Sequence, residues 1–88
     1  MRKRRGVPAL YPNPTGGRFT VAFNASREVN HVDIQVTTIT GQQVLSRSYD
    51  HAGLQFTADL DLGSQARGIY FVEIKADGDK ITRKLIVQ

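Results

Sequence analysis

The chain has 88 residues, of which 40% are hydrophobic, with a formal charge of +4 at pH 7 and no cysteine. A chain of this length can build one domain around a single core, and it leaves little room for a deep catalytic cleft. The lack of cysteine excludes disulfides, thiolate catalysis and cysteine-ligated metal, and no apolar run approaches the ~20 residues of a membrane-spanning helix.

The positive charge is concentrated at the start of the chain. Residues 2–5, Arg-Lys-Arg-Arg, supply all of the formal excess, because the rest of the chain has equal numbers of basic and acidic residues. A nucleic-acid-binding domain carries its basic excess on the folded surface. We therefore predict a disordered basic leader or linker over residues 1–9, a single domain over residues 10–88, and no nucleic-acid partner.

A segment rich in turn formers comes next, Tyr11-Pro12-Asn13-Pro14-Thr15-Gly16-Gly17. Proline fixes its own φ and pushes the preceding residue out of the helical region, and glycine permits a positive φ. The segment is therefore predicted to be an extended stretch followed by a tight turn.

Strictly alternating apolar residues then indicate strands with one buried face, because strand side chains alternate with a period of two. The predicted inward residues are, in chain order, Phe19, Val21, Phe23, Val32, Ile34, Val36, Leu54, Phe56, Ala58, Leu60, Leu62, Tyr70, Val72, Ile74 and Ala76. Phe71 has the outward parity, and the adjacent Val44 and Leu45 leave the polarity of their strand ambiguous.

Turn signals separate these strands. They predict a hairpin connection at residues 39–43, a loop at 63–68 and a hairpin turn at 77–79, before a last strand at 80–87. No window favours an amphipathic helix. The pattern predicts an all-β antiparallel sandwich or barrel of about seven strands.

No constellation of residues points to catalysis or to a cofactor. His31 and His51 each lie within two positions of an aspartate, yet no nucleophile elbow occurs. The Asp-x-Asp pairs at 59–61 and 77–79 are predicted to be surface and turn residues, because neither fits a calcium loop. We predict no catalytic residue, no metal, no cofactor and no small-molecule substrate.

Four motifs occur in a distinctive order along the chain. They are Tyr11-Pro12-Asn13-Pro14 with Gly17, then Gly41 before an apolar pair, then Gly68 and Tyr70 in Gly68-Ile69-Tyr70-Phe71-Val72, and finally Arg83-Lys84-Leu85-Ile86-Val87. In this order they resemble the C-terminal sorting domain of the type IX secretion system, the Por secretion tail, over residues 10–88.

The resemblance implies an immunoglobulin-like β-sandwich and a non-catalytic role. Such domains stand at the C-terminus of exported proteins, whose own signal peptide takes them across the inner membrane into the periplasm. The tail is read by the outer-membrane translocon and commonly removed by a sortase-like cysteine peptidase, and the cargo reaches the cell surface or is released. The implied partners are therefore the translocon, the peptidase and an upstream cargo.

The motif residues divide into two groups by their expected role. Turns account for the prolines and glycines, and the core accounts for Tyr70. We expect direct recognition at the last strand, Arg83, Lys84, Leu85, Ile86 and Val87, because a short basic strand can add to the edge of a partner sheet or meet an acidic receptor groove.

Two features depart from the family. The chain ends in Gln88, where a basic residue is frequent in the family. Neither a cargo nor a signal peptide precedes the domain, since residues 1–9 are the whole upstream part and residues 6–10 are too short and proline-interrupted for the apolar part of a signal peptide. We therefore expect an isolated tail without an export signal of its own, either excised from a longer protein or produced by a shortened reading frame. Three alternatives stay open: a stand-alone adhesion or carbohydrate-binding sandwich, a small enzyme, and a polyanion-binding protein acting through residues 2–5.

Overall fold

The structure, a computed structural model, describes residues 8–88 and consists of strands joined by turns and loops. The five strands are β1 (Ala9–Tyr11), β2 (Arg18–Thr38), β3 (Gln43–Asp61), β4 (Gly68–Ala76) and β5 (Asp79–Val87). The basic run at residues 2–5 lies outside the described residues. Within residues 8–88, no helix is long and apolar enough to cross a membrane.

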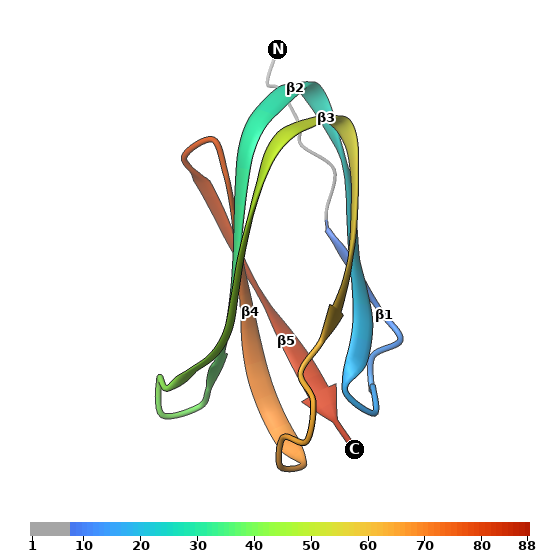
Figure 1. Cartoon of the computed structure of the whole chain (residues 1–88), viewed down its shortest axis with the longest axis vertical. Coiled ribbons are helices and arrows are strands. Elements are labelled where there is room, and N and C mark those ends of the chain that lie inside the picture. The colour runs from blue at the N-terminus through green and yellow to red at the C-terminus, as the bar shows by residue number, and fades with distance from the viewer. Residues whose placement is uncertain (1–7) are drawn as a thin grey trace.

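The two long strands bend together and thereby form two layers. Residues 18–24 of β2 pair with residues 55–61 of β3, and residues 31–37 of β2 pair with residues 43–50 of β3. Between these arms the register shifts on both strands, which is where they turn over at the top of Figure 1. Bulges of this kind bend a strand and increase its twist.

Each layer is completed by strands that pair with one arm of β2. In the first layer β1 lies antiparallel to residues 20–22, and in the second layer β4 pairs with residues 32–38 and carries β5 on its far side. The strand order is therefore β1-β2-β3 in the first layer and β3-β2-β4-β5 in the second. Two layers of antiparallel strands in this arrangement form an immunoglobulin-like sandwich.

The number of strands differs from the sequence prediction for a physical reason. About seven separate strands were expected, whereas the structure has five, because β2 and β3 each run through the bend without interruption. Counting each arm of a long strand separately gives the seven segments of such a sandwich.

The core lies between the layers and follows the predicted alternation. Every predicted inward residue except Leu54 is buried, and Val29, Leu45, Leu85 and Val87 join them. Leu54 is 50% exposed because it lies in the bend, where the period of two breaks down. Val44 is the extra residue of a bulge, since Val36 pairs with Leu45 and the next pair already involves Gln43, which explains the two adjacent apolar residues.

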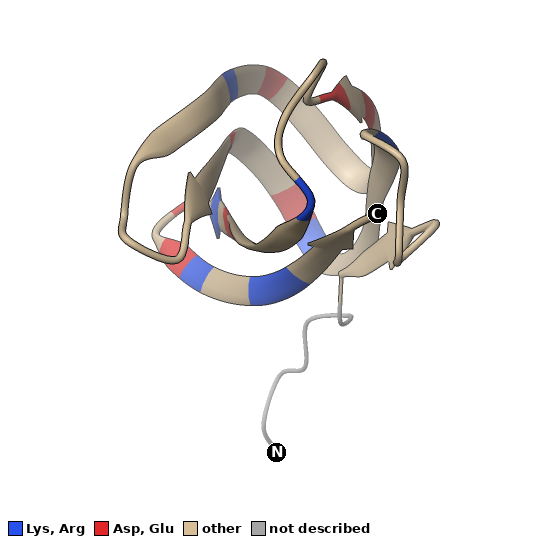
Figure 2. Cartoon of the chain, turned by 90° about the horizontal axis from the view of Figure 1, so that it is seen from below, with Lys and Arg blue, Asp and Glu red and all other residues tan. Residues whose placement is uncertain are grey.

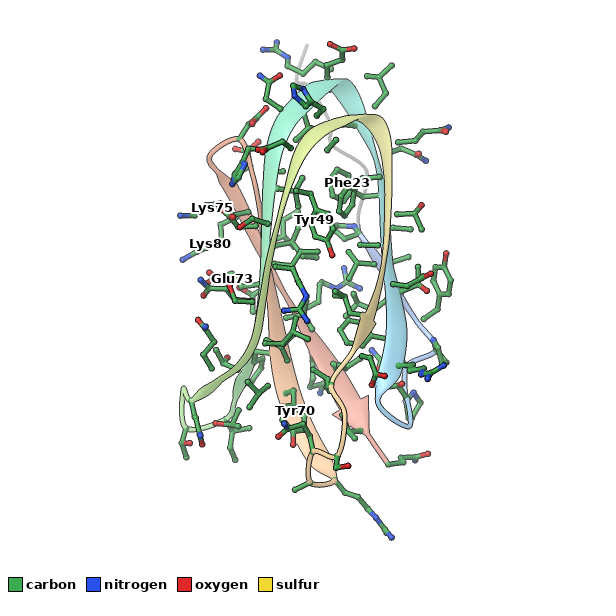
Figure 3. All side chains as sticks on the ribbon, viewed as in Figure 1. Phe23, Tyr49, Tyr70, Glu73, Lys75 and Lys80 are labelled. Carbon is green, nitrogen blue, oxygen red and sulfur yellow. The ribbon has the colours of Figure 1, made fainter. Side chains whose placement is uncertain are left out.

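A buried tyrosine fixes the loop that leads into β4. The Tyr70 hydroxyl donates a hydrogen bond to the Ala66 carbonyl oxygen at 2.6 Å, and the side chain is 5% exposed. A tyrosine near the start of the corresponding strand, bonded to the backbone a few residues upstream, is the tyrosine corner of immunoglobulin-like domains. Figure 3 places Tyr70 at the loop end of the molecule, far from Tyr49 and Phe23 in the upper core.

The Tyr70→Phe variant tests this corner. It removes the partly buried hydrogen bond from Tyr70 to the Ala66 carbonyl, so the free energy of unfolding should fall by about 1 kcal/mol. Urea denaturation followed by circular dichroism measures the loss. Tyr49→Phe is the matched control, because the Tyr49 ring packs against Phe56 and its hydroxyl makes no hydrogen bond within residues 8–88. An equal loss in both variants would contradict the assignment.

Candidate functional site at the C-terminal strand

The first and the last sequence motif are in contact. The Asn13 side-chain amide donates to the Lys84 carbonyl oxygen at 2.9 Å, and its side-chain oxygen accepts the Ile86 backbone N–H at 3.0 Å. An amide side chain presents a donor and an acceptor like those of a peptide group. Asn13 therefore occupies the outer edge of β5 as a neighbouring strand would.

Thr15 continues this contact by two residues. Its backbone N–H donates to the Ile86 carbonyl, and its carbonyl accepts the Gln88 N–H, both at 2.8 Å. These two bonds form a parallel bridge between Thr15 and Val87. Asn13 and Thr15 together are called the edge clamp below.

The clamp is held in place by buried polar contacts. Thr15 is 3% exposed, and its hydroxyl accepts the Gly17 N–H at 3.0 Å and donates to the Arg18 carbonyl. Gly17 has a φ of 135°, and a Cβ atom there would lie 3.3 Å from the Gly63 carbonyl oxygen. Only glycine fits that position without strain. Thr15 was not among the predicted motif residues, although a hydroxyl two residues before a turn glycine is a recognised turn signal.

The other motif residues lie apart from the clamp or beside it. Pro12 and Pro14 both follow cis peptide bonds. Gly41 is in the turn between β2 and β3, and Gly68 begins β4, each with a positive φ. Tyr11, the last residue of β1, is 50% exposed. The structure thus brings together the first and last motifs, while Gly41 serves a distant turn.

Burial divides the predicted recognition residues of β5 into two sets. Leu85 and Val87 point into the core and are 0% and 4% exposed, so a partner can reach them only if the strand detaches. Arg83 and Lys84 are exposed, and Ile86 is half-buried on the outer face opposite Ile69. The accessible part of the predicted set is therefore two cations and one isoleucine.

The cations of β5 differ in their partners. Lys80 forms an ion pair with Glu73 of β4, with 3.6 Å between the ammonium nitrogen and the carboxylate oxygen. These two residues and Lys75 lie side by side on the outer face in Figure 3. Arg83 and Lys84 form no ion pair in the part of the chain that the structure describes. Figure 2 shows basic bands on the strand that leads to the C-terminus.

A second polar cluster lies on the outer face of the second layer. The His31 ring nitrogens contact the Asp50 carboxylate at 2.7 Å and the Asp33 carboxylate at 2.9 Å, and the Ser48 hydroxyl donates to Asp33 at 2.6 Å. The two carboxylates raise the pKa of His31, and the hydrogen bond that the imidazole donates to Asp50 is the larger cause. The hydrogen bond from Ser48 is the main cause that lowers the pKa of Asp33.

The geometry of this cluster does not assemble a nucleophile and its base. The Ser48 hydroxyl is bonded to the Asp33 carboxylate, and both ring nitrogens of His31 contact carboxylates, so the imidazole is not bonded to the Ser48 hydroxyl. Within residues 8–88 there is also no group of three or more acidic, histidine or cysteine side chains suited to a metal ion. Asp77, in the turn between β4 and β5, binds the backbone N–H groups of Asn30 and His31, which ties that turn to β2.

These features define the class of the protein: an immunoglobulin-like sandwich whose terminal strand is held at the molecular edge by its first motif. The chain belongs to the family described as the secretion system C-terminal sorting domain, whose match covers residues 9–88. This finding confirms the resemblance seen in the sequence. The domain is a sorting signal of type IX secretion, a family that is generally non-catalytic and whose cargo goes to the cell surface or is secreted.

Solved structures with a similar fold include a module of a bacterial enzyme. This enzyme is the chitinase ChiW from Paenibacillus sp. str. FPU-7, a bacterial cell-surface-expressed multi-modular enzyme, with a TM-score of 0.58 and 20% sequence identity. The match covers 100% of this chain and 9% of the chitinase chain, so the similarity concerns one module and shows the fold alone. No curated protein matches the sequence.

The edge clamp predicts a stability effect at Asn13. Asn13→Ala removes two hydrogen bonds to the β5 backbone, so the free energy of unfolding should fall by about 1–2 kcal/mol. Amide hydrogen exchange should show faster exchange at Ile86 in this variant. Asn24→Ala is the control, because Asn24 is exposed on β2 and its side chain makes no hydrogen bond within the described residues. Unchanged protection of Ile86 would argue against the clamp.

The His31 cluster predicts a pH dependence with a definite sign. Because the folded-state pKa of His31 is raised, its stabilising contribution is fully present below the unfolded value of about 6.5 and is lost as the pH rises through the folded pKa. The Asp33 contribution behaves oppositely, since its lowered pKa makes it disappear as the pH falls through that value. A titration of His31 by NMR should show a lower pKa in Asp50→Asn than in the parent. A His31 pKa that is equal in the two proteins would exclude Asp50 as the main cause.

Proposed function

We propose that this domain directs a protein attached at its N-terminal side to the type IX outer-membrane translocon, and that a sortase-like peptidase then removes it. Family membership supports the sorting role. We place the recognition site at Arg83 and Lys84, on a strand at the edge of the second layer. This choice rests on their exposure and on the lack of an ion pair to either side chain in residues 8–88.

The folded state of β5 supports recognition as a structured element. The strand pairs with β4 along its whole length and is covered on its other side by the edge clamp at residues 84–88. Its buried residues Leu85 and Val87 anchor it in the core. A translocon that binds the exposed cations would therefore read a strand of fixed conformation, which lowers the entropic cost of binding.

The proposed cleavage lies on the N-terminal side of the domain. Pro8 is buried, and residues 9–11 are paired with β2. A peptidase needs an extended and accessible segment, whereas a hydrogen-bonded strand must first open locally. A cut before Pro8 would release the sandwich whole and leave the cargo with a short remnant.

Carbohydrate binding is less well supported. A sugar-binding platform needs neighbouring exposed aromatic rings. The aromatic residues with substantial exposure in residues 8–88 are Tyr11, at 50%, and Phe71, at 37%. They project from opposite layers, since Tyr11 pairs with Thr20 in the first layer and Phe71 with Thr37 in the second.

The test is export of a reporter. A signal peptide and a reporter are placed before the full chain in a bacterium that has the type IX translocon, and the double variant Arg83→Glu/Lys84→Glu is compared with the parent. Reversing two charges should reduce the surface or medium fraction by about tenfold, because opposite charges at a contact become like charges. Cell fractionation with immunoblotting measures the distribution.

The matched control reverses two other exposed cations, Arg47→Glu/Arg67→Glu, and should be exported like the parent. Deletion of residues 83–88 is less selective, because it also removes Leu85 and Val87 from the core. If the parent fusion stays in the periplasm, the sorting function is wrong. If only the choice of β5 is wrong, the parent and the double variant will be exported equally.

A further inference from the structure

The backbone groups on the outer edge of β5 are only partly hydrogen-bonded. The edge clamp takes up the Lys84 carbonyl, both backbone groups of Ile86 and the Gln88 N–H. All of these belong to even-numbered residues. Successive residues of a strand alternate between the two sides of the ladder, so the odd-numbered residues point their backbone groups toward β4.

The same alternation identifies a free stretch of edge. Lys80 and Thr82 each present an N–H and a carbonyl outward, and Lys84 adds its N–H. No other strand of residues 8–88 pairs with this side of β5, and the edge clamp contacts it at residues 84–88. The free stretch of edge therefore runs from Lys80 to Lys84, and the edge clamp begins directly at its C-terminal end.

The charges around this stretch define what fits it. Lys80 and Lys84 lie on the outer face and Arg83 on the opposite one. Lys80 forms an ion pair with Glu73, and Asp79 precedes it at the start of β5. A second copy of β5 would bring the same three cations against them, and like charges on adjacent strands are destabilising. Complementarity instead requires acidic side chains.

We infer that the stretch Lys80–Lys84 accepts an extended acidic segment of a partner protein as an added strand, positioned end to end with the edge clamp. This inference rests on the proposed function and specifies the partner of the same strand. Backbone hydrogen bonds to Lys80, Thr82 and Lys84 supply the affinity, and carboxylates of the partner beside Arg83 and Lys84 supply the selectivity. The clamp fixes the register, because it already occupies the positions beyond Lys84.

Thr82→Pro isolates the backbone contribution. Thr82 faces Glu73 across the ladder, and its N–H points outward, so proline removes an edge donor and leaves the bonds between β4 and β5 in place. Thr82→Val keeps the N–H and the side-chain size and is the control. With the reporter fusion, export should fall by about tenfold in Thr82→Pro and stay at the parental level in Thr82→Val.

Two further measurements test the fold of the variants and the contact with a partner. Thermal unfolding of each variant shows whether the fold survives. If Thr82→Pro unfolds, Lys80→Pro replaces it, because the Lys80 N–H also points outward near the start of β5. Its control is Lys80→Ala, which loses the same charge and the ion pair with Glu73 but keeps the N–H. In exporting cells, a carbodiimide, which couples amines to carboxylates, should join the parent to a partner through Lys84. The adduct should disappear in Lys84→Arg, which keeps the charge without a reactive amine.

The outcomes separate the possibilities. Export of a folded Thr82→Pro protein at the parental level, or an equal defect in Thr82→Val, would overturn strand addition. A dimer of the parent in size-exclusion chromatography that Thr82→Pro abolishes would identify a second copy as the occupant and refute the acidic partner. Retention of the parent fusion in the periplasm would overturn the proposed function and this inference with it.

Discussion

The pairing of β2 with β3 through the bend is the constraint on which the rest of the structure depends. One hydrogen-bonded ladder supplies a pair of strands to each layer, so the two layers are joined by backbone and not by side-chain packing alone. Strands β1 and β4 pair with opposite arms of β2, and β5 follows on β4. A shift of register in this ladder would turn the buried faces of both layers outward.

The alternation of apolar residues was sufficient to predict the strands and most of the core, because burial of one face imposes a period of two. It failed at the bend. Residues 25–30 have no regular alternation, so neither the continuity of β2 nor the burial of Val29 could be predicted. Leu54 continued the pattern in the sequence, yet it lies where the strand leaves the core. A local pattern predicts a local conformation and does not report where two strands turn together.

The candidate site is formed by contacts between parts of the chain that are far apart in the sequence. Local patterns of residue type do not predict such contacts. The bonds from Asn13 to Lys84 and Ile86 span 71 and 73 residues. The prolines and glycines of the first motif predicted a turn. The hydrogen bonds of the Asn13 side chain could not be predicted, because they depend on the position of β5 in the fold. The His31 cluster has the same origin, because its aspartates come from a neighbouring position on β2 and from β3.

The edge clamp makes the two ends of the described domain mechanically dependent on each other. Four hydrogen bonds join Asn13 and Thr15 to residues 84–88. A force that pulls on the chain before β1 is therefore transmitted to β5 through these bonds. The strand can be peeled away from β4 at this end only after they have broken.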